Sequence, residues 1–178
     1  MTSSASDISR QWHDQLFGIR RSIRYHNRRR AFFDRLDQFG NMLSVMLGSA
    51  AIYGVLDKDY HNVALIASAL VTSVSAINLV IGTAQRARAH FDFARQFTTL
   101  EQQMLVPESM MVLAEITAAR LDIEANEPPV LFVLDSMCHN ELLRADGYPR
   151  EDFVKIRWWQ RLCSQVVDLR EDLIRNPA

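Results

Sequence analysis

An uncharged run from Tyr60 to Gln85 constrains the fold of this chain more than any other feature. Its 26 residues include no Asp, Glu, Lys or Arg. As a helix rising about 1.5 Å per residue, the run would extend roughly 39 Å, whereas the hydrocarbon core of a bilayer is about 30 Å thick. A second uncharged run, the 18 residues of Phe39–Leu56, is separated from it only by Asp57, Lys58 and Asp59. Together the two runs predict a transmembrane hairpin.

The main alternative is that both runs are core helices of a water-soluble bundle. Ser68, Thr72 and Ser73 support this alternative, because they make the second run only moderately apolar. Helices at the surface of soluble proteins, however, keep a polar or charged face opposite the core. Neither run has a charged face, so we favour the membrane interpretation.

Arginines flank the two runs on their outer sides. The first run follows Arg20, Arg21, Arg24, Arg28, Arg29, Arg30 and Arg35, and the second precedes Arg86, Arg88 and Arg95. Short flanks rich in Lys and Arg stay in the cytoplasm, so we expect both termini there and the loop around Lys58 on the opposite side. A basic cluster beside a hydrophobic span also favours contact with anionic membrane lipids over direct binding of nucleic acid.

The pattern of the whole chain predicts an all-α membrane protein in three parts. Residues 1–38 form an Arg-rich N-terminal cytoplasmic helix, residues 39–85 the transmembrane hairpin with spans at about 39–56 and 60–85, and residues 86–178 a cytoplasmic helical stalk and bundle. In the first part, apolar residues recur every three or four positions at Ile8, Trp12, Leu16, Ile19 and Ile23. This spacing places them on one side of a helix that continues through the arginines.

The third part begins as a continuation of the second span. Phe93, Phe97, Leu100 and Met104 keep a helical spacing until Pro107 interrupts it, and Ser109 can cap the next helix, which ends before Pro128. A further helix carries Leu131, Leu134, Cys138 and Leu142 on one side and stops at Gly147 and Pro149. The last helix, from about Glu151, has apolar residues at alternating intervals of three and four: Trp159, Leu162, Val166, Leu169 and Leu173. This seam predicts a short coiled coil and a homo-oligomer.

The second span carries a stripe of small and hydroxyl-bearing residues. At about 100° per residue, Ala64, Ser68, Thr72, Ser75, Leu79 and Gly82 fall on one third of the helix, with Asn78 at the margin. Two uses of this stripe remain open. It can pack helices closely within the hairpin, or it can line a water-filled pore in an oligomer, because a single hairpin cannot enclose one.

The residues that could carry chemistry are Cys138, His139 and Glu141. Neighbouring residues on a helix point about 100° apart, so Cys138 and His139 cannot easily converge on one atom. A partner such as His90, Glu124 or Glu127 would have to complete the site. The sequence has no glycine-rich phosphate loop, GxSxG or HExxH motif, and its two cysteines form no CxxC pair. We therefore expect no enzyme activity, cofactor or metal centre, and Met1–Gln11 lacks the character of a cleaved signal.

The ordered features resemble the SLATT domains, the two-transmembrane modules associated with SMODS nucleotidyltransferases and SLOG sensor domains. The resemblance covers residues 10–170 approximately. It rests on the approach segment 25–33, the two spans with their short loop, and two cytoplasmic motifs. These motifs are Glu124, Ala125, Asn126, Glu127, Pro128 and Pro129, and then Cys138, His139, Asn140 and Glu141.

The resemblance implies a pore-forming or membrane-disrupting effector of a bacterial antiviral system, located in the inner membrane. Its trigger would be a nucleotide signal, a sensor or a nucleotidyltransferase partner. The alternative is a non-conducting membrane scaffold that docks a separately encoded sensor or enzyme through its cytoplasmic helices. A third hypothesis, a membrane-attached enzyme that uses Cys138 and His139, is the weakest.

Overall fold

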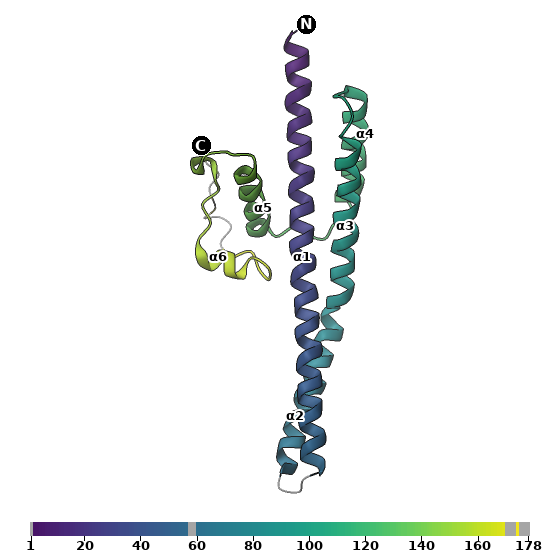
Figure 1. The fold of residues 1–178 in the computed structure, drawn as a ribbon, viewed down its shortest axis with the longest axis vertical. Coiled ribbons are helices and arrows are strands. Elements are labelled where there is room, and N and C mark those ends of the chain that lie inside the picture. The colour runs from purple at the N-terminus through teal and green to yellow at the C-terminus, as the bar shows by residue number, and fades with distance from the viewer. Residues whose placement is uncertain (1, 57–59, 170–173, 175–178) are drawn as a thin grey trace. The chain divides into compact units, whose positions relative to one another are not determined.

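A computed structural model describes residues 2–56, 60–169 and 174 of the chain, and these residues include helices but no strand. The elements in order are α1 (Thr2–Leu56), α2 (His61–Ile81), α3 (Thr83–Gln103), α4 (Met110–Glu124), α5 (Phe132–Ala145), the 3-10 turn η2 (Arg150–Asp152) and α6 (Trp158–Cys163) (Figure 1). The predicted all-α fold class is confirmed. The predicted loop between the spans, at residues 57–59, lies outside the described residues.

The chain divides into two compact units. One, which we call the bundle unit, contains residues 1–29 and 90–178, and the other, the hairpin unit, contains residues 30–89. Helices α1 and α3 each belong partly to one unit and partly to the other. The long first helix predicted from the N-terminal periodicity is present, since α1 has 55 residues without a break.

The core of the bundle unit joins α1, α3 and α4. Its buried residues are Trp12, Ile19, Phe97, Leu100, Met104, Leu113, Ile116 and Ile123. Leu16, Ile23 and Phe93 pack against this cluster. The two apolar stripes predicted on α1 and α3 therefore face each other, because helical residues three and four apart share one side. A buried core of this kind is stabilised mainly by the hydrophobic effect.

Helix α5 packs on α1 through a second, smaller cluster. Tyr25 of α1, together with Leu134 and Cys138 of α5, is buried there, and Leu131 packs against them. The backbone N–H of Leu131 donates to the Tyr25 hydroxyl at 3.0 Å. Leu142 is also buried, so the predicted apolar side of α5 is confirmed.

The predicted long final helix and its coiled-coil seam are wrong. Helix α6 has only six residues, residues 154–157 before it are not helical, and Phe153 and Arg157 have extended backbone conformations. Side chains hold this region outside a helix by binding its backbone: the Asn140 amide bonds both the N–H and the C=O of Val154, at 2.8 and 2.7 Å. Those two groups cannot then join a helical ladder. Leu173, the end of the predicted seam, lies outside the described residues.

The C-terminal loop instead completes the first turn of α5. The Asp168 carboxylate accepts hydrogen bonds from the backbone N–H groups of Phe132 and Val133, at 2.6 and 3.0 Å. These are N–H groups that lack partners within the helix, and a negative charge is favourable at that end. The loop is therefore a structural part of the bundle unit.

In the hairpin unit, the second apolar helix is interrupted at Gly82. This residue adopts the left-handed conformation, with φ 63° and ψ 47°, and its N–H donates to Asn78 C=O at 3.0 Å. A residue with a side chain would be strained in that conformation. The sequence predicted an unbroken helix through Gln85, whereas the structure ends α2 at Ile81 and starts α3 at Thr83.

The two helices of the hairpin unit meet through very small residues. A Cβ atom added to Gly54 would lie 2.7 Å from the Tyr60 carbonyl oxygen and 2.9 Å from the Ala64 nitrogen. Ala64 and Ala67 are the buried apolar residues of α2. Close approach of this kind is typical of helix pairs that associate by backbone packing rather than by large side chains.

Candidate functional site

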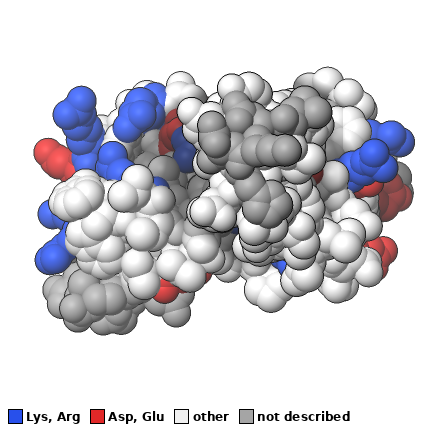
Figure 2. All heavy atoms as spheres, turned by 90° about the horizontal axis from the view of Figure 1, so that it is seen from below, with Lys and Arg blue, Asp and Glu red and all other residues white. Residues whose placement is uncertain are grey.

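Most of the apolar surface of the hairpin unit is exposed. The helical stretch Asn62–Gln103 contains a window with a mean hydropathy of 2.1, of which only 11% is buried. Among the described residues it is the one helix that is long and apolar enough to span a membrane. Seen from the hairpin end, the described residues nearest the viewer are neither acidic nor basic (Figure 2). The same length and apolarity occur in core helices of soluble proteins, but those are mostly buried.

The predicted hydroxyl stripe divides into two parts. Ser68, Thr72 and Ser75 are exposed, whereas Asn78 and Gly82 are half-buried. The hydroxyl of Ser68 donates to Leu65 C=O and that of Thr72 donates to Ser68 C=O, each at 2.9 Å. Ala64 and Ala67, rather than the hydroxyl residues, are buried within the unit. Packing between the two helices of one hairpin therefore does not use the exposed part of the stripe.

The half-buried part of the stripe belongs to a polar cluster centred on Asp37 of α1. Asp37 Oδ1 accepts from Thr83 Oγ1 at 2.7 Å and from Asn78 Nδ2 at 3.4 Å. Asp37 Oδ2 accepts from Asn41 Nδ2 at 3.0 Å. The Thr83 hydroxyl also lies 2.5 Å from Asn78 Oδ1. Residues 37 and 83 lie 46 positions apart in the sequence, and their pairing identifies the base of the hairpin.

A cavity of about 340 Å³ opens beside this cluster. Polar side chains from both helices line it: Asp37, Asn41, Ser44, Ser75, Asn78 and Thr83. On α1 the first three recur at intervals of four and three, so they share one side of the helix. Asp37 was not among the predicted site residues, although its spacing to Asn41 and Ser44 is a signal for a shared polar side of α1.

The arginines predicted to orient the protein and contact lipid are largely engaged within the chain. Ion pairs join Arg20 to Glu101 at 2.7 Å, Arg21 to Asp135 at 3.2 Å, Arg28 to Glu141, Arg30 to Asp34 at 3.4 Å, and a hydrogen bond joins Arg29 to the Gln165 carbonyl. Arg24 lines a cavity of about 310 Å³ with Arg20. Arg86 donates to Ile81 C=O at 2.9 Å, and Arg88 is exposed. In the bundle unit, Arg20 connects α1 with α3, whereas Arg21 and Arg28 connect α1 with α5.

The Cys138, His139 and Glu141 motif does not form one site. Burial raises the pKa of the fully buried Cys138 thiol to about 12, so the thiol stays protonated at neutral pH. Burial, reinforced by the Arg21 charge, lowers the pKa of His139, which lies edge to face with Phe17. Glu141 pairs with Arg28. The three groups thus point to three different partners.

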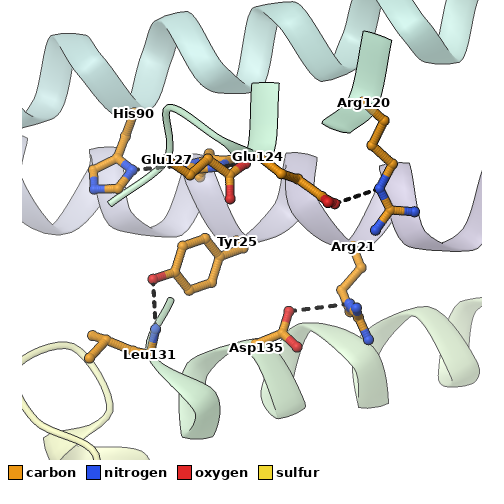
Figure 3. Close-up of polar contacts among 9 residues, drawn as sticks. Arg21, Tyr25, His90, Arg120, Glu124, Glu127, Leu131 and Asp135 are labelled. Carbon is orange, nitrogen blue, oxygen red and sulfur yellow. Dashed lines mark hydrogen bonds and ion pairs between the residues drawn. The ribbon is translucent and has the colours of Figure 1, made fainter. Parts of the chain in front are cut away.

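The residues expected to complete that motif are also used elsewhere. Glu124 pairs with Arg120 at 2.6 Å, and the Asn126 side chain donates to Asp122 C=O at 2.8 Å. Figure 3 shows the Glu124 pair beside Glu127 and His90, which belong to a separate buried group. Asn140 holds Val154, as described above. The family-like residues therefore contact several different partners within the bundle unit and do not converge on one point.

The separate buried group is a chain of three side chains from three segments. His26 Nε2 lies 3.0 Å from Glu127 Oε1, and His26 Nδ1 lies 2.9 Å from His90 Nδ1. Both histidines are buried. The His26 ring stacks on Phe93 and Phe97, with ring centroids 5.2 and 5.7 Å away. Tyr25 lies edge to face with His26.

The contacts of this group restrict which ring nitrogens can donate to one another. If His26 is neutral and donates from Nε2 to the carboxylate, its Nδ1 must accept a proton from His90 Nδ1. Both polar contacts are then satisfied by one arrangement of tautomers. The sequence analysis named His90 and Glu127 but missed His26 as their partner, since only the fold brings residues 26, 90 and 127 together. In the described chain, no group of three or more His, Cys, Asp or Glu side chains is arranged to hold a metal ion.

Comparisons of this chain with protein-family models, with curated proteins and with solved structures gave no match. Its function is therefore argued from its own residues. The exposed apolar helix and the polar cluster at the base of the hairpin unit are the features on which that argument rests.

Proposed function

We propose that this chain is an oligomeric two-transmembrane protein whose assembled hairpins open a path across the membrane. The observation that carries the proposal is the exposed apolar surface of α2. Leu79 and Val80 are 83% and 85% exposed, and the most apolar window of this helix is only 11% buried. Monomeric soluble proteins rarely leave apolar patches of this extent in water. Lipid tails and neighbouring hairpins would cover them.

The apolar residues of the adjoining part of α1 support a second span. Exposed residues in this segment are Phe39, Met42, Val45, Met46, Ile52, Tyr53 and Val55. Among the described residues of α2, the buried apolar side chains are those of Ala64 and Ala67. Helices in lipid associate in this way because apolar side chains gain nothing by leaving the lipid for one another.

The exposed hydroxyl stripe supports a pore. Ser68 and Thr72 bond to carbonyls of their own helix, so they remain tolerable on a surface that faces either lipid or water. Because this stripe is exposed in the single chain, it is free to face another copy. Several hairpins arranged around an axis would bring their hydroxyls to one lumen.

The biological role proposed for this pore follows the resemblance to SLATT domains. The chain would act as an effector of a bacterial antiviral system in the inner membrane, with both termini in the cytoplasm. Its bundle unit would receive the signal from a sensor or nucleotidyltransferase partner. Arginines on the cytoplasmic side of the spans would set this orientation.

The test is conductance of the purified full chain in vesicles of phosphatidylethanolamine and phosphatidylglycerol. We expect the triple variant Ser68→Ala, Thr72→Ala, Ser75→Ala to insert and assemble but to conduct far less, because it keeps the helix surface small while removing the hydroxyls. Ser75→Leu should also block the path. The matched control is Ser73→Ala, which removes an exposed hydroxyl outside the stripe. An assembled protein that leaves vesicles impermeable to small ions contradicts the pore.

A non-conducting scaffold is the second candidate function. Its support is the set of exposed apolar side chains in the bundle unit, which includes Leu105, Met111, Trp158, Leu162 and Val166. Such residues can dock a partner protein. The scaffold hypothesis predicts retained partner binding and no conductance, whether or not the hydroxyl stripe is present.

A further inference from the structure

We propose that the Asp37 cluster at the base of the hairpin binds a monovalent cation and makes the conducting path selective for cations. This inference rests on the proposed pore, but its binding step can be tested without conductance. It starts from the oxygen atoms that the fold places together. Asp37, Asn78 and Thr83 come from α1, α2 and the start of α3, and they meet beside the cavity of about 340 Å³.

Two acceptor oxygens of the cluster compete for the single proton of the Thr83 hydroxyl. Thr83 Oγ1 lies 2.7 Å from Asp37 Oδ1 and 2.5 Å from Asn78 Oδ1. A hydroxyl has one proton, so it can serve only one of these two acceptors at a time. The other oxygen pair then lies close without a hydrogen bond between its members. A cation satisfies such a group, because carboxylate, amide and hydroxyl oxygens are the ligands that hard cations prefer.

The negative charge on Asp37 is available to a mobile cation, because the hydrogen-bond partners of this carboxylate are neutral. Its partners in the hairpin unit are the neutral side chains of Asn41, Asn78 and Thr83. Across the described residues, no Lys or Arg forms an ion pair with Asp37. The nearby cations have other partners: Arg30 pairs with Asp34, and Arg86 donates to Ile81 C=O while its guanidinium lies over the Phe33 ring.

The ligand class follows from the count of charges. The cluster has one carboxylate, and its other oxygens are neutral. Protein sites for Ca²⁺ usually gather several carboxylates, and Mg²⁺ demands a strict octahedral shell. One carboxylate with neutral oxygens instead suits Na⁺ or K⁺. In an oligomer, the same position would present a ring of Asp37 carboxylates, and such rings favour cations over anions.

The position of the cluster also suits an ion path. Ser75 and Ser44 line the cavity on the side of the apolar runs, and Ser75 belongs to the proposed hydroxyl stripe. The cavity thus connects the acidic cluster with the stripe along one side of α2. A cation that leaves Asp37 would next meet hydroxyl groups rather than apolar side chains.

The binding arm of the test uses the purified full chain in detergent. Its Tm is compared in KCl, NaCl and the chloride of the bulky cation N-methyl-D-glucamine, at equal ionic strength. At a salt concentration about five times the dissociation constant, a bound ion should raise Tm by about 2–4 °C. Asp37→Asn should abolish this difference between salts, whereas the control Asp34→Asn should keep it.

The conductance arm measures the reversal potential across a KCl gradient in planar bilayers of phosphatidylethanolamine and phosphatidylglycerol. The wild-type chain should prefer cations, and Asp37→Asn should lose this preference. If Asp37→Asn fails to assemble, Asn41→Lys tests whether charge in this cavity sets the ion preference. It adds a positive charge at an exposed position that lines the cavity. It should shift the preference toward chloride.

The outcomes separate the two proposals. A salt-independent Tm, or an equal loss of stability in all salts for Asp37→Asn, would limit Asp37 to a hydrogen-bonding role and overturn this inference. Conductance without cation preference would overturn it as well and leave the pore standing. Cation-dependent stability in a protein that never conducts would support the binding site and overturn the pore.

Discussion

The bundle unit and the hairpin unit differ in the size of the side chains that they bury. The bundle unit buries large side chains from three helices, among them Trp12, Phe97 and Ile116. The hairpin unit buries Phe33 and several alanines, and it exposes many of its large aliphatic side chains, such as Ile66, Leu79 and Val80. The hydrophobic effect in water can hold the first unit together, but it cannot hold the second. This difference is what the proposed insertion of the hairpin unit into a membrane would require.

The two units also differ in the partners of some of their polar side chains. In the bundle unit, charged pairs such as Arg20 with Glu101 and Arg21 with Asp135 link separate helices. In the hairpin unit, the hydroxyls of Ser68, Thr72 and Ser73 bond within α2. Satisfying polar groups inside one helix is what a lipid environment requires, since lipid tails offer no hydrogen bonds.

The largest effect should come from charging the exposed face of α2. Ile66 and Leu70 are exposed, and in water their replacement by Arg would be harmless. At the centre of a membrane helix each Arg disfavours insertion by about 3 kcal/mol. We expect Ile66→Arg with Leu70→Arg to abolish membrane insertion, measured by carbonate extraction of membranes.

The control for this prediction lies in the bundle unit. Met111 is 70% exposed, so Met111→Arg should leave insertion unchanged. If the doubly charged variant instead remains in carbonate-extracted membranes as the wild-type chain does, lipid does not surround this face of α2 and the comparison between the units fails.

The next effect concerns the bundle core. Phe97→Ala removes a fully buried ring and should lower the free energy of unfolding of the bundle unit by about 3–5 kcal/mol. Urea unfolding followed by tryptophan fluorescence measures it, because Trp12 belongs to the same cluster. Phe91→Ala, at a more exposed site on α3, should have a much smaller effect. Membrane insertion should not change in either variant, and a loss of insertion in Phe97→Ala would show that the units are not independent.

The smallest effect concerns the buried chain of His26, His90 and Glu127. Glu127→Ala leaves the buried His26 N–H without an acceptor and should destabilise the bundle unit by about 1–3 kcal/mol. Glu127→Gln keeps an acceptor oxygen, so its loss should be smaller. The same urea titration compares the two variants. Equal losses would mean that His26 needs a negative charge beside it and is protonated on both nitrogens.

The sequence predicted the helices well where apolar spacing had a clear period. The stripes of α1 and α3 form the bundle core, and α5 buries the side that was predicted. Such patterns are local, and burial of one face follows directly from them. The failure came after Glu151, where the apolar residues also repeat like a helix. Hydrogen bonds from Asn140, which lies in α5, hold Val154 outside a helix, and no local pattern encodes that contact.

The candidate sites were harder to predict than the helices. The polar cluster needs Asp37 and Thr83 to meet, and the buried chain needs residues 26, 90 and 127 to meet. These contacts depend on which helices pack together. Helix pairing results from many weak interactions spread over the chain, and no short sequence pattern predicts it. The adjacent pair Cys138 and His139 was conspicuous in the sequence, but α5 directs the two side chains to different surroundings.

The burial of Cys138 makes its reaction with a thiol reagent a measure of opening of the bundle unit. A thiol reagent attacks the thiolate, and this thiol is fully buried with a pKa of about 12. Cys163 is only partly buried, so it can react while the protein stays folded. Modification of Cys138 must wait for α5 to separate from α1. The rate of Cys138 modification therefore reports how often the bundle unit opens. Cys163 should react faster, in the folded state, so one experiment distinguishes surface exposure from local opening.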